Sequence, residues 1–448
     1  MADTISVIGA GYVGLTTATL LAESGYTTYV IDINNERLAT IRSGRSFFFE
    51  EGLDSLISHA IKSGKLIPTD SYEESVAKSD FVFSCVGTPD NPDGSSNLTY
   101  VFQAAKQAAD LLQADTIYIQ KSTVPVGTGE RIEKMFSEKE KKIHYVSNPE
   151  FLREGTAITD TLWFDRIVAG GVNKEAVSKV LGLYRTIEKS RQDIANRAGI
   201  KDPRRESGSY ITTNRDSAEL IKVTANAFLA LKVSFANSIA KLADHTGADV
   251  NEVMDAVGAD RRIGRAFLNA GRGYGGGCFP KDVSGLISSA NEHSVDLPIM
   301  IAAADVNETM PGYIANKAQS EIGNLKGKRV AVLGLSFKAG TSDARRSPGV
   351  KLANVLAKSG AKVMVYDPQA NGEAKEDLRR DVNLCDSSDE AITDADAVFI
   401  TTEWPELIKL DPKKLKKMMN GNVLVDCMNM FDKHKVSEAG LIYIGVGR

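Results

Sequence analysis

Short apolar runs alternate with segments of helical pattern along the first two hundred residues of the chain. The runs have the length of buried strands and cover residues 5–8, 27–31, 80–86, 116–120, 144–146 and 166–169. Strands that alternate with helices form parallel sheets, because each parallel connection must cross over the sheet. The pattern therefore predicts a doubly wound α/β domain over residues 1–209.

The pattern changes to that of one long helix in the middle of the chain. From Ser217 to His245 there is no Pro or Gly, and apolar residues recur every three or four positions. This spacing predicts a helix with an apolar stripe, which opens a central domain over residues 210–322. A helix of this length can join two domains and supply a dimer face.

A second alternation of strands and helices fills the C-terminal part of the chain. Its apolar runs are residues 329–335, 362–367, 397–401 and 422–426. They predict a second parallel sheet over residues 323–448. The expected fold class is thus α/β, with two doubly wound parallel-sheet domains joined by a long central helix.

One polar segment interrupts this pattern. Residues 187–209 contain several charges, a Pro-Arg-Arg sequence and small polar residues. We interpret the segment as a solvated loop, with a regulatory or partner-binding role as the alternative.

A glycine motif follows the first predicted strand. The sequence Gly9-Ala-Gly11-Tyr-Val-Gly14 leads into a helix, and the next strand ends at Asp32, 18 residues after Gly14. In this context Gly9 permits a tight turn, Gly11 lets a pyrophosphate approach the backbone, and Gly14 lets helix and strand pack closely. Asp32 suits a ribose diol and repels a 2′-phosphate, so the motif predicts NAD rather than NADP. An ordinary strand-to-helix turn is the alternative.

The composition limits the partners of the chain. Of its 448 residues 42% are hydrophobic and 25% are charged, as in soluble globular proteins. A net charge of -4 argues against a surface for nucleic acid or acidic membranes. No secretory signal precedes the first strand and no run approaches 18 apolar residues, so we expect a cytoplasmic protein that spans no membrane.

Cys278 stands out among the four cysteines. It follows a glycine-dense stretch from Gly271 to Gly277 and precedes Lys281 and Asp282. The glycines favour an accessible loop, and a nearby cation and carboxylate favour a reactive thiolate. A buried structural cysteine is the alternative. The other cysteines are far apart, so neither a metal site nor a disulfide framework is predicted.

Four more motifs lie near predicted strand ends or on the central helix. They are residues 85–89 (Cys-Val-Gly-Thr-Pro), 121–128 (Lys-Ser-Thr-Val-Pro-Val-Gly-Thr), 148–156 (Asn-Pro-Glu-Phe-Leu-Arg-Glu-Gly-Thr) and 222–228 (Lys-Val-Thr-Ala-Asn-Ala-Phe). Lys222 and Asn226 are four positions apart, so they project from one helical face among apolar neighbours. Taken singly, each motif also fits a turn, a helix start or a polar stripe.

Together with the segment from Gly275 to Asp282, these motifs resemble the UDP-glucose/GDP-mannose dehydrogenase family, in order, from Ile5 to about Lys435. The resemblance implies two Rossmann-like domains joined by a long helix, with NAD on the first and a UDP-sugar held between them. It also implies a homodimer. The implied reaction oxidises a primary alcohol at C6 to a carboxylate, using two NAD and one water.

The resemblance further assigns the catalytic roles. Cys278 would attack the C6 aldehyde to form a thiohemiacetal, and a second oxidation would leave a thioester. Lys222 would stabilise the developing oxygen anion, and Asn226 would donate a hydrogen bond to the same oxygen.

Four polar residues complete the implied catalytic set. Asp282 and Thr123 would position and help to activate the water. Glu154 would act in thioester hydrolysis or in relaying protons through that water. Glu150 would shape the substrate pocket.

The implied binding residues form two sets. Those for NAD are Gly9, Gly11, Tyr12, Val13, Gly14, Asp32, Arg37, Thr88, Thr123, Glu154 and Arg345. Those for the sugar nucleotide are Glu150, Phe151, Leu152, Lys222, Asn226, Arg262, Phe267, Tyr274, Gly275 and Lys338. In the family an arginine at the place of Arg262 reaches across a dimer interface, and a cation at Lys338 suits a diphosphate. Both also fit plain surface charges.

One departure from the family leaves the sugar open. The family has Asp-Gly-Arg-Asn where this chain has Asp426-Cys-Met428-Asn429. A methionine cannot replace a guanidinium toward a sugar or phosphate, so either another basic residue such as Arg272 substitutes or the preferred sugar differs. The segment 187–209 is also longer than is usual in the family.

Three other functions stay open. Phe279-Pro-Lys281 resembles the UDP-glucose branch of the family, but the same chemistry on GDP-mannose or a UDP-N-acetylhexosamine is an alternative. A two-electron β-hydroxyacid dehydrogenase shares the glycine motif and a helical lysine, and it needs no Cys278. A non-catalytic NAD-binding regulator is the third, although the retained Lys222, Asn226 and Cys278 argue against it.

Overall fold

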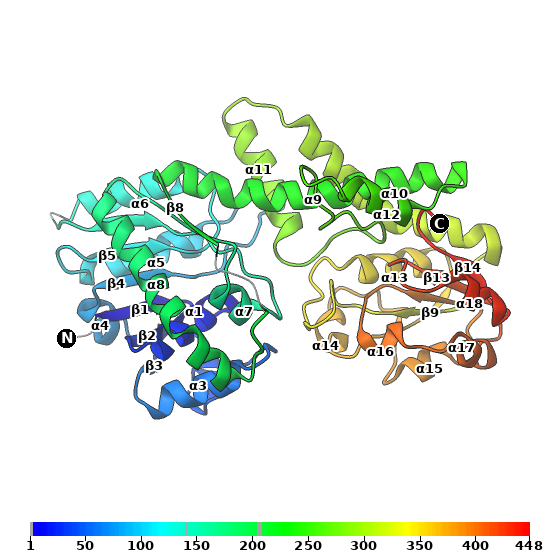
Figure 1. Ribbon diagram of the computed structural model, residues 1–448, viewed down its shortest axis with the longest axis horizontal. Helices are drawn as coiled ribbons and strands as arrows, with labels where there is room; N and C mark the ends of the chain where they lie inside the picture. The colour runs from blue at the N-terminus through cyan, green and yellow to red at the C-terminus, as the bar shows by residue number, and fades with distance from the viewer. Residues whose placement is uncertain (1–2, 140, 204–207) are drawn as a thin grey trace. The chain divides into compact units, whose positions relative to one another are not determined.

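The computed structural model describes residues 3–139, 141–203 and 208–448. The chain divides into two compact units, Met1–Thr224 and Ala225–Arg448, which we call the first and the second unit (Figure 1). Each unit contains one β-sheet. The finer division at residues 209 and 322 stays a prediction.

The sheet of the first unit has eight strands. They are β1 (Thr4–Ile8), β2 (Thr27–Ile31), β3 (Leu66–Thr69), β4 (Phe81–Ser84), β5 (Ile117–Gln120), β6 (His144–Ser147), β7 (Arg166–Gly170) and β8 (Ser209–Thr213). Their order is β3-β2-β1-β4-β5-β6-β7-β8, and neighbours are parallel except β6 and β7, which share the antiparallel pair Ser147 and Gly170. This arrangement confirms the predicted fold class. The apolar pattern had not predicted β3 and β8.

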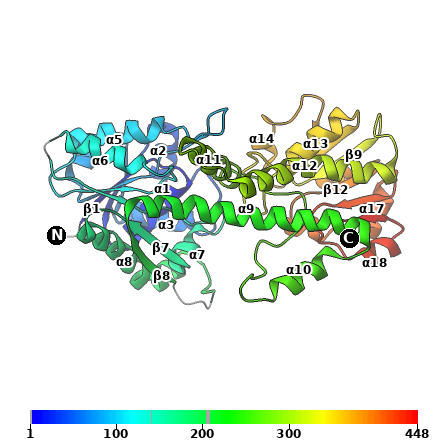
Figure 2. The same cartoon turned by 90° about the horizontal axis from the view of Figure 1, so that it is seen from above.

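Helices cover both faces of this sheet. They are α1 (Tyr12–Glu23), α2 (Asn35–Arg42), α3 (Leu53–Lys62), α4 (Tyr72–Ser75), the 3-10 helix η1 (Val76–Lys78), α5 (Thr99–Leu111), α6 (Thr128–Ser137), α7 (Ala157–Leu162) and α8 (Lys174–Ala198). Figure 2 shows α5 and α6 on one side of the strands and α7 and α8 on the other. Because successive strand residues point to opposite faces, Phe81 and Phe83 join the core under α1, α3 and α8, whereas Val82 joins the core under α5 and α6.

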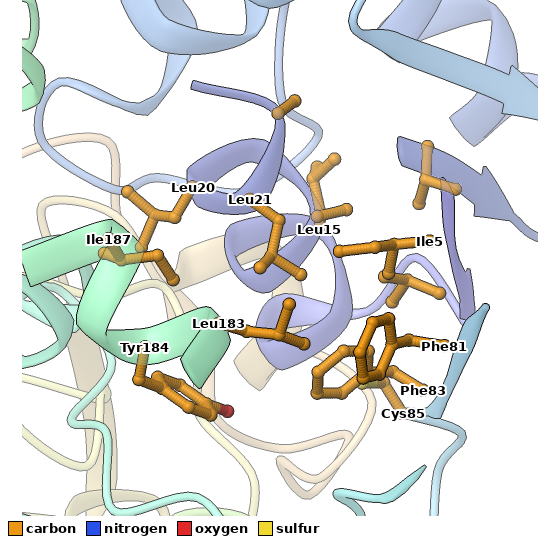
Figure 3. Packing of buried hydrophobic residues seen from close by; sticks show 14 of the residues in the cluster. Ile5, Leu15, Leu20, Leu21, Phe81, Phe83, Cys85, Leu183, Tyr184 and Ile187 are labelled. Carbon is orange, nitrogen blue, oxygen red and sulfur yellow. The ribbon is translucent and has the colours of Figure 1, made fainter. Parts of the chain in front are cut away.

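The core around α1 fixes the position of the glycine motif. In Figure 3 Leu15, Leu20 and Leu21 of α1 lie among side chains from β1, β4 and α8, such as Ile5 and Leu183. All five side chains are buried. The N-terminal end of α1 is therefore held at the end of β1.

Helix α8 corrects one prediction. It extends to Ala198, so residues 187–198 are helical and do not belong to a solvated loop. Ile187, Ile194 and Ala195 of this stretch are buried in the core of the first unit. Gly199 ends the helix with a left-handed φ of 70°. Residues 204–207 of the predicted loop lie outside the described residues.

Helix α9 (Arg215–Thr246) confirms the predicted long helix. The boundary between the two units falls within it, after Thr224. Among the described residues α9 is the one helix long and apolar enough to cross a membrane by length and composition. Core helices of soluble proteins pass the same test, and Ala236, Ala240 and Ala243 are buried in the core of the second unit. The helix is therefore weak evidence for a membrane span.

The second unit is built around six strands. They are β9 (Arg329–Leu333), β10 (Lys362–Tyr366), β11 (Asn383–Leu384), β12 (Ala397–Ile400), β13 (Val423–Asp426) and β14 (Ile442–Ile444). Their order is β11-β10-β9-β12-β13-β14, and every pair is parallel. The second doubly wound sheet thus forms where the apolar runs predict it.

The helices of the second unit follow α9 along the chain. They are α10 (Val250–Gly258), α11 (Phe279–Glu292), α12 (Pro298–Ile322), α13 (Pro348–Lys358), α14 (Asn371–Ala374), α15 (Ser388–Ile392), α16 (Pro405–Ile408), α17 (Pro412–Met418) and α18 (Lys433–Glu438). Residues of α12 and α13 share one core with Val330 and Val332, and residues of α15, α17 and α18 share another with Ala331 and Leu333.

Candidate active site

The glycine motif of the first unit forms a narrow turn between β1 and α1. Gly9 has a left-handed φ of 96°, and a Cβ there would lie 2.9 Å from the backbone oxygen of Cys85. A Cβ on Gly14 would overlap the backbone oxygen of Gly9, whereas a Cβ on Gly11 would meet no atom within 4 Å. The motif therefore needs glycine at Gly9 and Gly14 for packing, and it leaves open space at Gly11 before the N-terminal end of α1. A diphosphate fits such a site.

Asp32 ties this turn to the neighbouring strand. Its carboxylate, at the end of β2, accepts hydrogen bonds from the backbone N–H of Ala10 (2.9 Å) and of Asn34 (2.9 Å). Arg37 lies 3.8 Å from the same carboxylate and stacks over Phe47 at 4.8 Å. The glycines and an acid at the end of β2 together fit a dinucleotide, which agrees with the prediction of NAD.

Tyr12 connects the glycine motif to the loop that carries Glu154. Its hydroxyl donates to the carboxylate of Glu50 and accepts a hydrogen bond from the backbone N–H of Gly155 at 2.5 Å. Glu50 also accepts from the N–H of Ile158 at 3.2 Å, and burial raises the pKa of its carboxyl. Glu50 is not among the residues predicted from the sequence. The signal that could have found it is a carboxylate directly after three consecutive phenylalanines.

Glu150 and Lys222 form a buried ion pair. The Lys222 Nζ lies 3.0 Å from a carboxylate oxygen of Glu150, and the lysine side chain is only 4% exposed. The other oxygen of Glu150 accepts from the N–H of Leu152 at 2.5 Å. Lys222 and Arg166 lie 5.4 Å and 3.9 Å from the ring centre of Phe151. The structure thus brings three predicted substrate residues around one lysine.

Thr123 lies in the turn between β5 and α6. The preceding Ser122 donates from its hydroxyl to the backbone oxygen of Val86 at 2.7 Å, just beyond β4. Thr88 follows two residues after Val86 in the same segment. Both predicted threonines therefore stand on neighbouring loops beyond the carboxyl ends of β4 and β5, the edge where open α/β sheets bind ligands.

Cys278 is the exposed cysteine of the chain, whereas Cys85, Cys385 and Cys427 are buried. Burial raises the pKa of all three buried thiols, that of Cys85 to about 12. Cys278 is instead the N-cap residue of α11. The N-terminal end of a helix favours a negative charge, and thus the thiolate. The alternative of a buried structural cysteine is wrong.

Asp282 lies one turn into α11 and joins three groups. One carboxylate oxygen accepts from Asn226 Nδ2 at 2.6 Å, and the other lies 2.6 Å from Lys281 Nζ. The Asp282 N–H donates to the backbone oxygen of Cys278 at 2.8 Å. Asn226 and Lys281 therefore hold the buried carboxylate in the first turn of the helix that Cys278 caps.

The glycines before Cys278 are needed for packing. A Cβ on Gly275 would lie 2.5 Å from the backbone oxygen of Arg346, and one on Gly277 would lie 2.7 Å from the guanidinium of Arg345. A Cβ on Gly276 would lie 2.9 Å from the Phe337 ring. The sequence analysis explained these glycines by access alone, but the loop is closely packed against the segment 337–346.

An aromatic group surrounds the same loop. The rings of Phe267 and Tyr274 lie 5.9 Å and 6.0 Å from that of Phe279. Burial raises the pKa of Tyr274 to about 12. Asn307 of α12 accepts from the Tyr274 N–H at 2.7 Å and donates to its oxygen at 3.0 Å. Asn307 fixes the loop and was missed, because a lone Asn within a helix gives no motif.

Three predicted cations, of which Arg345 also packs against the loop before Cys278, make local contacts. The guanidinium of Arg262 pairs with Asp260 and its side chain is 88% exposed. Arg345 binds Asp343 at 2.6 Å and is also exposed, and Lys338 lies 5.7 Å from the ring centre of Phe337. These contacts are all between residues at most two positions apart in the sequence.

Arg272 is built into the second unit. Its guanidinium is buried and donates to the backbone oxygens of Ser336 (3.1 Å) and Phe337 (2.6 Å). Met428 follows β13 and is half-buried. Because both terminal nitrogens of Arg272 already bind the backbone, its role is to hold the turn after β9. Two of the five guanidinium donors of Arg272 are therefore bound to the backbone at the turn after β9.

Asp367 is used differently from Asp32 at the corresponding place in the second sheet. Like Asp32 it follows the second strand of its sheet, but its carboxylate accepts from the backbone N–H of Leu335 (2.7 Å) and Ser336 (2.9 Å) and from the Trp404 indole (3.1 Å). A carboxylate so occupied has little capacity left for a ribose diol. Among the described residues no group of three His, Cys, Asp or Glu side chains could hold a metal ion.

The fold and these groups define a class of protein. A doubly wound sheet with a glycine turn and an acidic strand end is the structure of a dinucleotide-binding protein. Comparison with known proteins then identifies the family. The chain matches the NAD binding domain (residues 3–188), the central domain (216–309) and the UDP binding domain (331–433) of the UDP-glucose/GDP-mannose dehydrogenase family. The chain belongs to this family and is an NAD-dependent nucleotide-sugar dehydrogenase.

Relatives support this assignment over the full length. The chain is 38% identical to a UDP-glucose 6-dehydrogenase of Rhizobium meliloti (strain 1021), over 99% of each chain. A solved UDP-glucose dehydrogenase of Pyrobaculum islandicum is 36% identical, with a TM-score of 0.89 over 100% of this chain and 98% of that one. A solved UDP-D-ManNAc dehydrogenase of Pyrococcus horikoshii is 29% identical, with a TM-score of 0.85 over 99% of each.

Proposed function

We propose that the protein oxidises UDP-glucose to UDP-glucuronate with two NAD and one water, through a covalent bond to Cys278. The observation that carries the proposal is the environment of this cysteine. Its thiol is exposed at the N-terminal end of α11, beside a carboxylate that Asn226 and Lys281 hold in place. The names and identities of the relatives favour UDP-glucose over the N-acetylated sugar.

The first oxidation converts the C6 alcohol into an aldehyde. When bound, NAD accepts the hydride in each of the two oxidations. The residues that hold it are those of the glycine turn together with Asp32. Lys222 stabilises the negative charge that develops on the C6 oxygen as its proton leaves. Its ion pair with Glu150 holds the ammonium in place.

The second oxidation takes place on the enzyme. The Cys278 sulfur adds to the aldehyde carbon, and the aldehyde oxygen takes up a proton, which gives a thiohemiacetal. Loss of a hydride and a proton leaves a thioester. Water then adds to the thioester carbon, the carbon–sulfur bond breaks, and the acid and the thiol are released.

The residues beside Cys278 serve the hydrolysis step. Asn226 Nδ2 has two hydrogens, of which Asp282 takes one, so the second is available for the C6 oxygen. Asp282 and Thr123 position the water, and Glu154 relays its proton. Because the thioester retains the sugar until water attacks, the aldehyde is not lost between the oxidations.

Each of three domains has its own role in binding and catalysis. We propose that residues 1–209 bind NAD, that residues 210–322 carry the long helix and the Cys278 loop, and that residues 323–448 bind the UDP part of the substrate. The remaining residues assigned to each ligand keep the roles that the family resemblance implies. We place the enzyme in the cytoplasm, without a membrane span.

A second copy of the chain completes the proposed assembly. Four exposed apolar residues recur every seven or eight positions along α9, as in a helix that packs on a partner: Leu220, Phe228, Phe235 and Leu242. We propose a homodimer through this stripe. Arg262, which is almost fully exposed in the single chain, is then available to the partner's site.

The alternative with a specific observation in its favour is another nucleotide sugar. Met428 lacks the positive charge that the family places there, and two donors of the buried Arg272 are bound to backbone oxygens. Turnover on a panel of UDP-glucose, GDP-mannose and UDP-N-acetylhexosamines decides between them. We expect NADH with UDP-glucose at a kcat/KM at least tenfold above that of each other sugar. Strong turnover of another sugar with none on UDP-glucose contradicts the choice.

A further inference from the structure

Glu219 is a buried carboxylate to which neither the family resemblance nor the proposed mechanism gives a role. It lies in the second turn of α9 and is 2% exposed. Its two oxygens accept separate hydrogen bonds, one from the N–H of Gly127 at 2.9 Å and the other from the N–H of Gly129 at 2.8 Å. Tyr145 of β6 adds a third contact at 3.3 Å. The carboxylate therefore caps the N-terminal end of α6 from another helix.

The capped end of α6 continues the loop that carries Thr123. Gly127 is the N-cap residue of α6 and has a left-handed φ of 89°. Two residues of this loop are fixed at its ends, Ser122 by Val86 and Gly127 by Glu219. Thr128 also closes a turn on the Pro125 oxygen at 2.7 Å. Thr123 thus lies in a short loop that is fixed by hydrogen bonds at both ends, and Glu219 accepts the bond at one of them.

The same side chain fixes the helix that carries Lys222. Lys222 follows Glu219 by three residues, which is about 4.5 Å along a helix. The pair of hydrogen bonds sets the position of this turn of α9 relative to α6. Lys222 then reaches Glu150 at 3.0 Å from that turn. One carboxylate therefore connects the loop of one proposed catalytic residue to the helix of another.

We propose that Glu219 is a positioning residue of the reaction, which sets Lys222 and Thr123 in register by binding the first turn of α6 from α9. The proposal rests on the proposed function, because it assumes that Lys222 and Thr123 act on one substrate. A displacement of about 1 Å at a reacting group costs up to about a hundredfold in rate. Loss of the two hydrogen bonds should therefore lower kcat more than it raises the KM for NAD.

Arg215 provides a matched control in the same place. This residue, in the first turn of α9, forms an ion pair with Glu133 of α6. Arg215 also lies 3.8 Å from Glu130 of α6, so the two helices are joined by these ion pairs and, separately, by Glu219 through the backbone of the Thr123 loop. Glu133→Gln removes the ion pair between Arg215 and Glu133 and leaves the hydrogen bonds of Glu219.

The experiment compares Glu219→Gln, Glu133→Gln and the unsubstituted protein as the complete chain. A glutamine side chain has a single oxygen, so in Glu219→Gln one of the two N–H groups loses its acceptor. We expect Glu219→Gln to lower kcat with UDP-glucose at least tenfold with a KM for NAD changed less than threefold. Glu133→Gln should keep kcat within twofold. Equal losses in the two variants, or an unchanged kcat in Glu219→Gln, overturn the proposal.

Two further measurements keep the test decisive. Hydrogen exchange of the Gly127 and Gly129 amides should become at least tenfold faster in Glu219→Gln and stay unchanged in Glu133→Gln, and unchanged protection in both overturns the proposal. If Glu219→Gln does not fold, Glu219→Asp retains the charge but is one methylene shorter, and it should also lower kcat at least tenfold; an unchanged kcat overturns the proposal. An unsubstituted protein without turnover of UDP-glucose contradicts the proposed function, while the exchange measurement still tests the contact.

Discussion

At the scale of single residues, one thiol of four is suited to react. Cys278 lies at the start of a helix, where the aligned backbone dipoles favour the thiolate, and its carbonyl is bonded to the N–H of Asp282. The three buried cysteines have raised thiol pKa values, which favours the unreactive protonated form. The difference between the four is therefore one of environment.

Substitution of Cys278 separates the two oxidations. Cys278→Ala should lower UDP-glucuronate formation at least a thousandfold, because the aldehyde has no sulfur to bind. Cys278→Ser should stall with the sugar attached to the protein, since an ester is hydrolysed more slowly than a thioester. Mass spectrometry of the intact variant after reaction detects the adduct. Full acid production by Cys278→Ala refutes the covalent route.

Glu219 makes the stability of the first unit depend on pH. Burial raises the pKa of its carboxyl from 4.5 to about 7, against the opposing effect of the Gly129 and Gly127 amides. Asp216 raises this pKa further and Arg215 lowers it, and the Tyr145 hydroxyl also faces the carboxyl. The folded chain thus binds more protons than the unfolded chain between these two values. Stability from this group is fully present below pH 4.5 and is lost as the pH rises through 7.

The Glu219→Gln variant removes this dependence. We expect the unsubstituted protein to lose up to about 3 kcal/mol more stability than the variant between pH 4.5 and pH 7.5. Thermal unfolding of both proteins at a series of pH values measures the difference. Parallel curves for the two proteins would show that the carboxyl does not titrate in this range.

The residues that sequence analysis found and missed differ in kind. Cys278 and the glycine turn stand in local motifs, so they could be singled out without a fold. The missed residues act through backbone groups that are distant in the sequence. The separation is 70 or more positions for Glu50 and Glu219, and 33 positions for Asn307. Their partners come close only after folding, so no local spacing in the sequence predicts these contacts.

At the scale of elements, apolar periodicity predicted most strands and the long helix. The exceptions have physical causes. Strand β8 lies at the edge of its sheet and exposes two of its five residues, so its apolar pattern is weak. The last three turns of α8 carry many charges on the exposed side, which hid Ile187, Ile194 and Ala195 on the buried side. The number of charges alone therefore predicted a loop, whereas the spacing of the apolar residues is that of an amphipathic helix.

The packing of α1 on β1 depends on Gly14. A Cβ there would overlap the backbone oxygen of Gly9 and press on the buried side chain of Cys85, and neither group can move aside easily. Gly14→Ala should destabilise the first unit by about 2–3 kcal/mol and abolish NAD binding. Gly11→Ala is the matched control, because its Cβ meets open space; it should keep the stability within about 1 kcal/mol while weakening NAD binding. Equal stability of the two variants, measured by denaturant unfolding, contradicts this account of the turn.

At the scale of the whole molecule, two doubly wound sheets share one chain but differ in their nucleotide chemistry. Asp32 follows its strand beside a glycine turn that leaves open space at Gly11. The carboxylate of Asp367 instead accepts hydrogen bonds from the backbone of the turn after β9. The proposed homodimer also belongs to this scale, because it would form through the exposed apolar stripe of α9.

A charge in this stripe should separate the proposed dimer. Phe235→Glu places a carboxylate among exposed apolar residues of α9, and we expect a monomer in sedimentation equilibrium at micromolar concentration, against a dimer for the unsubstituted protein. Val172→Glu is the control, because Val172 is exposed outside α9 and should leave the mass unchanged. A monomeric unsubstituted protein, or a Phe235→Glu dimer of unchanged affinity, counts against the interface.

The central claim is that one site oxidises the same carbon twice. The most direct test is the product stoichiometry with limiting UDP-glucose and excess NAD, measured as NADH absorbance together with chromatography of the sugar nucleotide. We predict two NADH for each UDP-glucose consumed, with UDP-glucuronate as the product. One NADH for each UDP-glucose with an aldehyde product, or no NADH at all, contradicts the account.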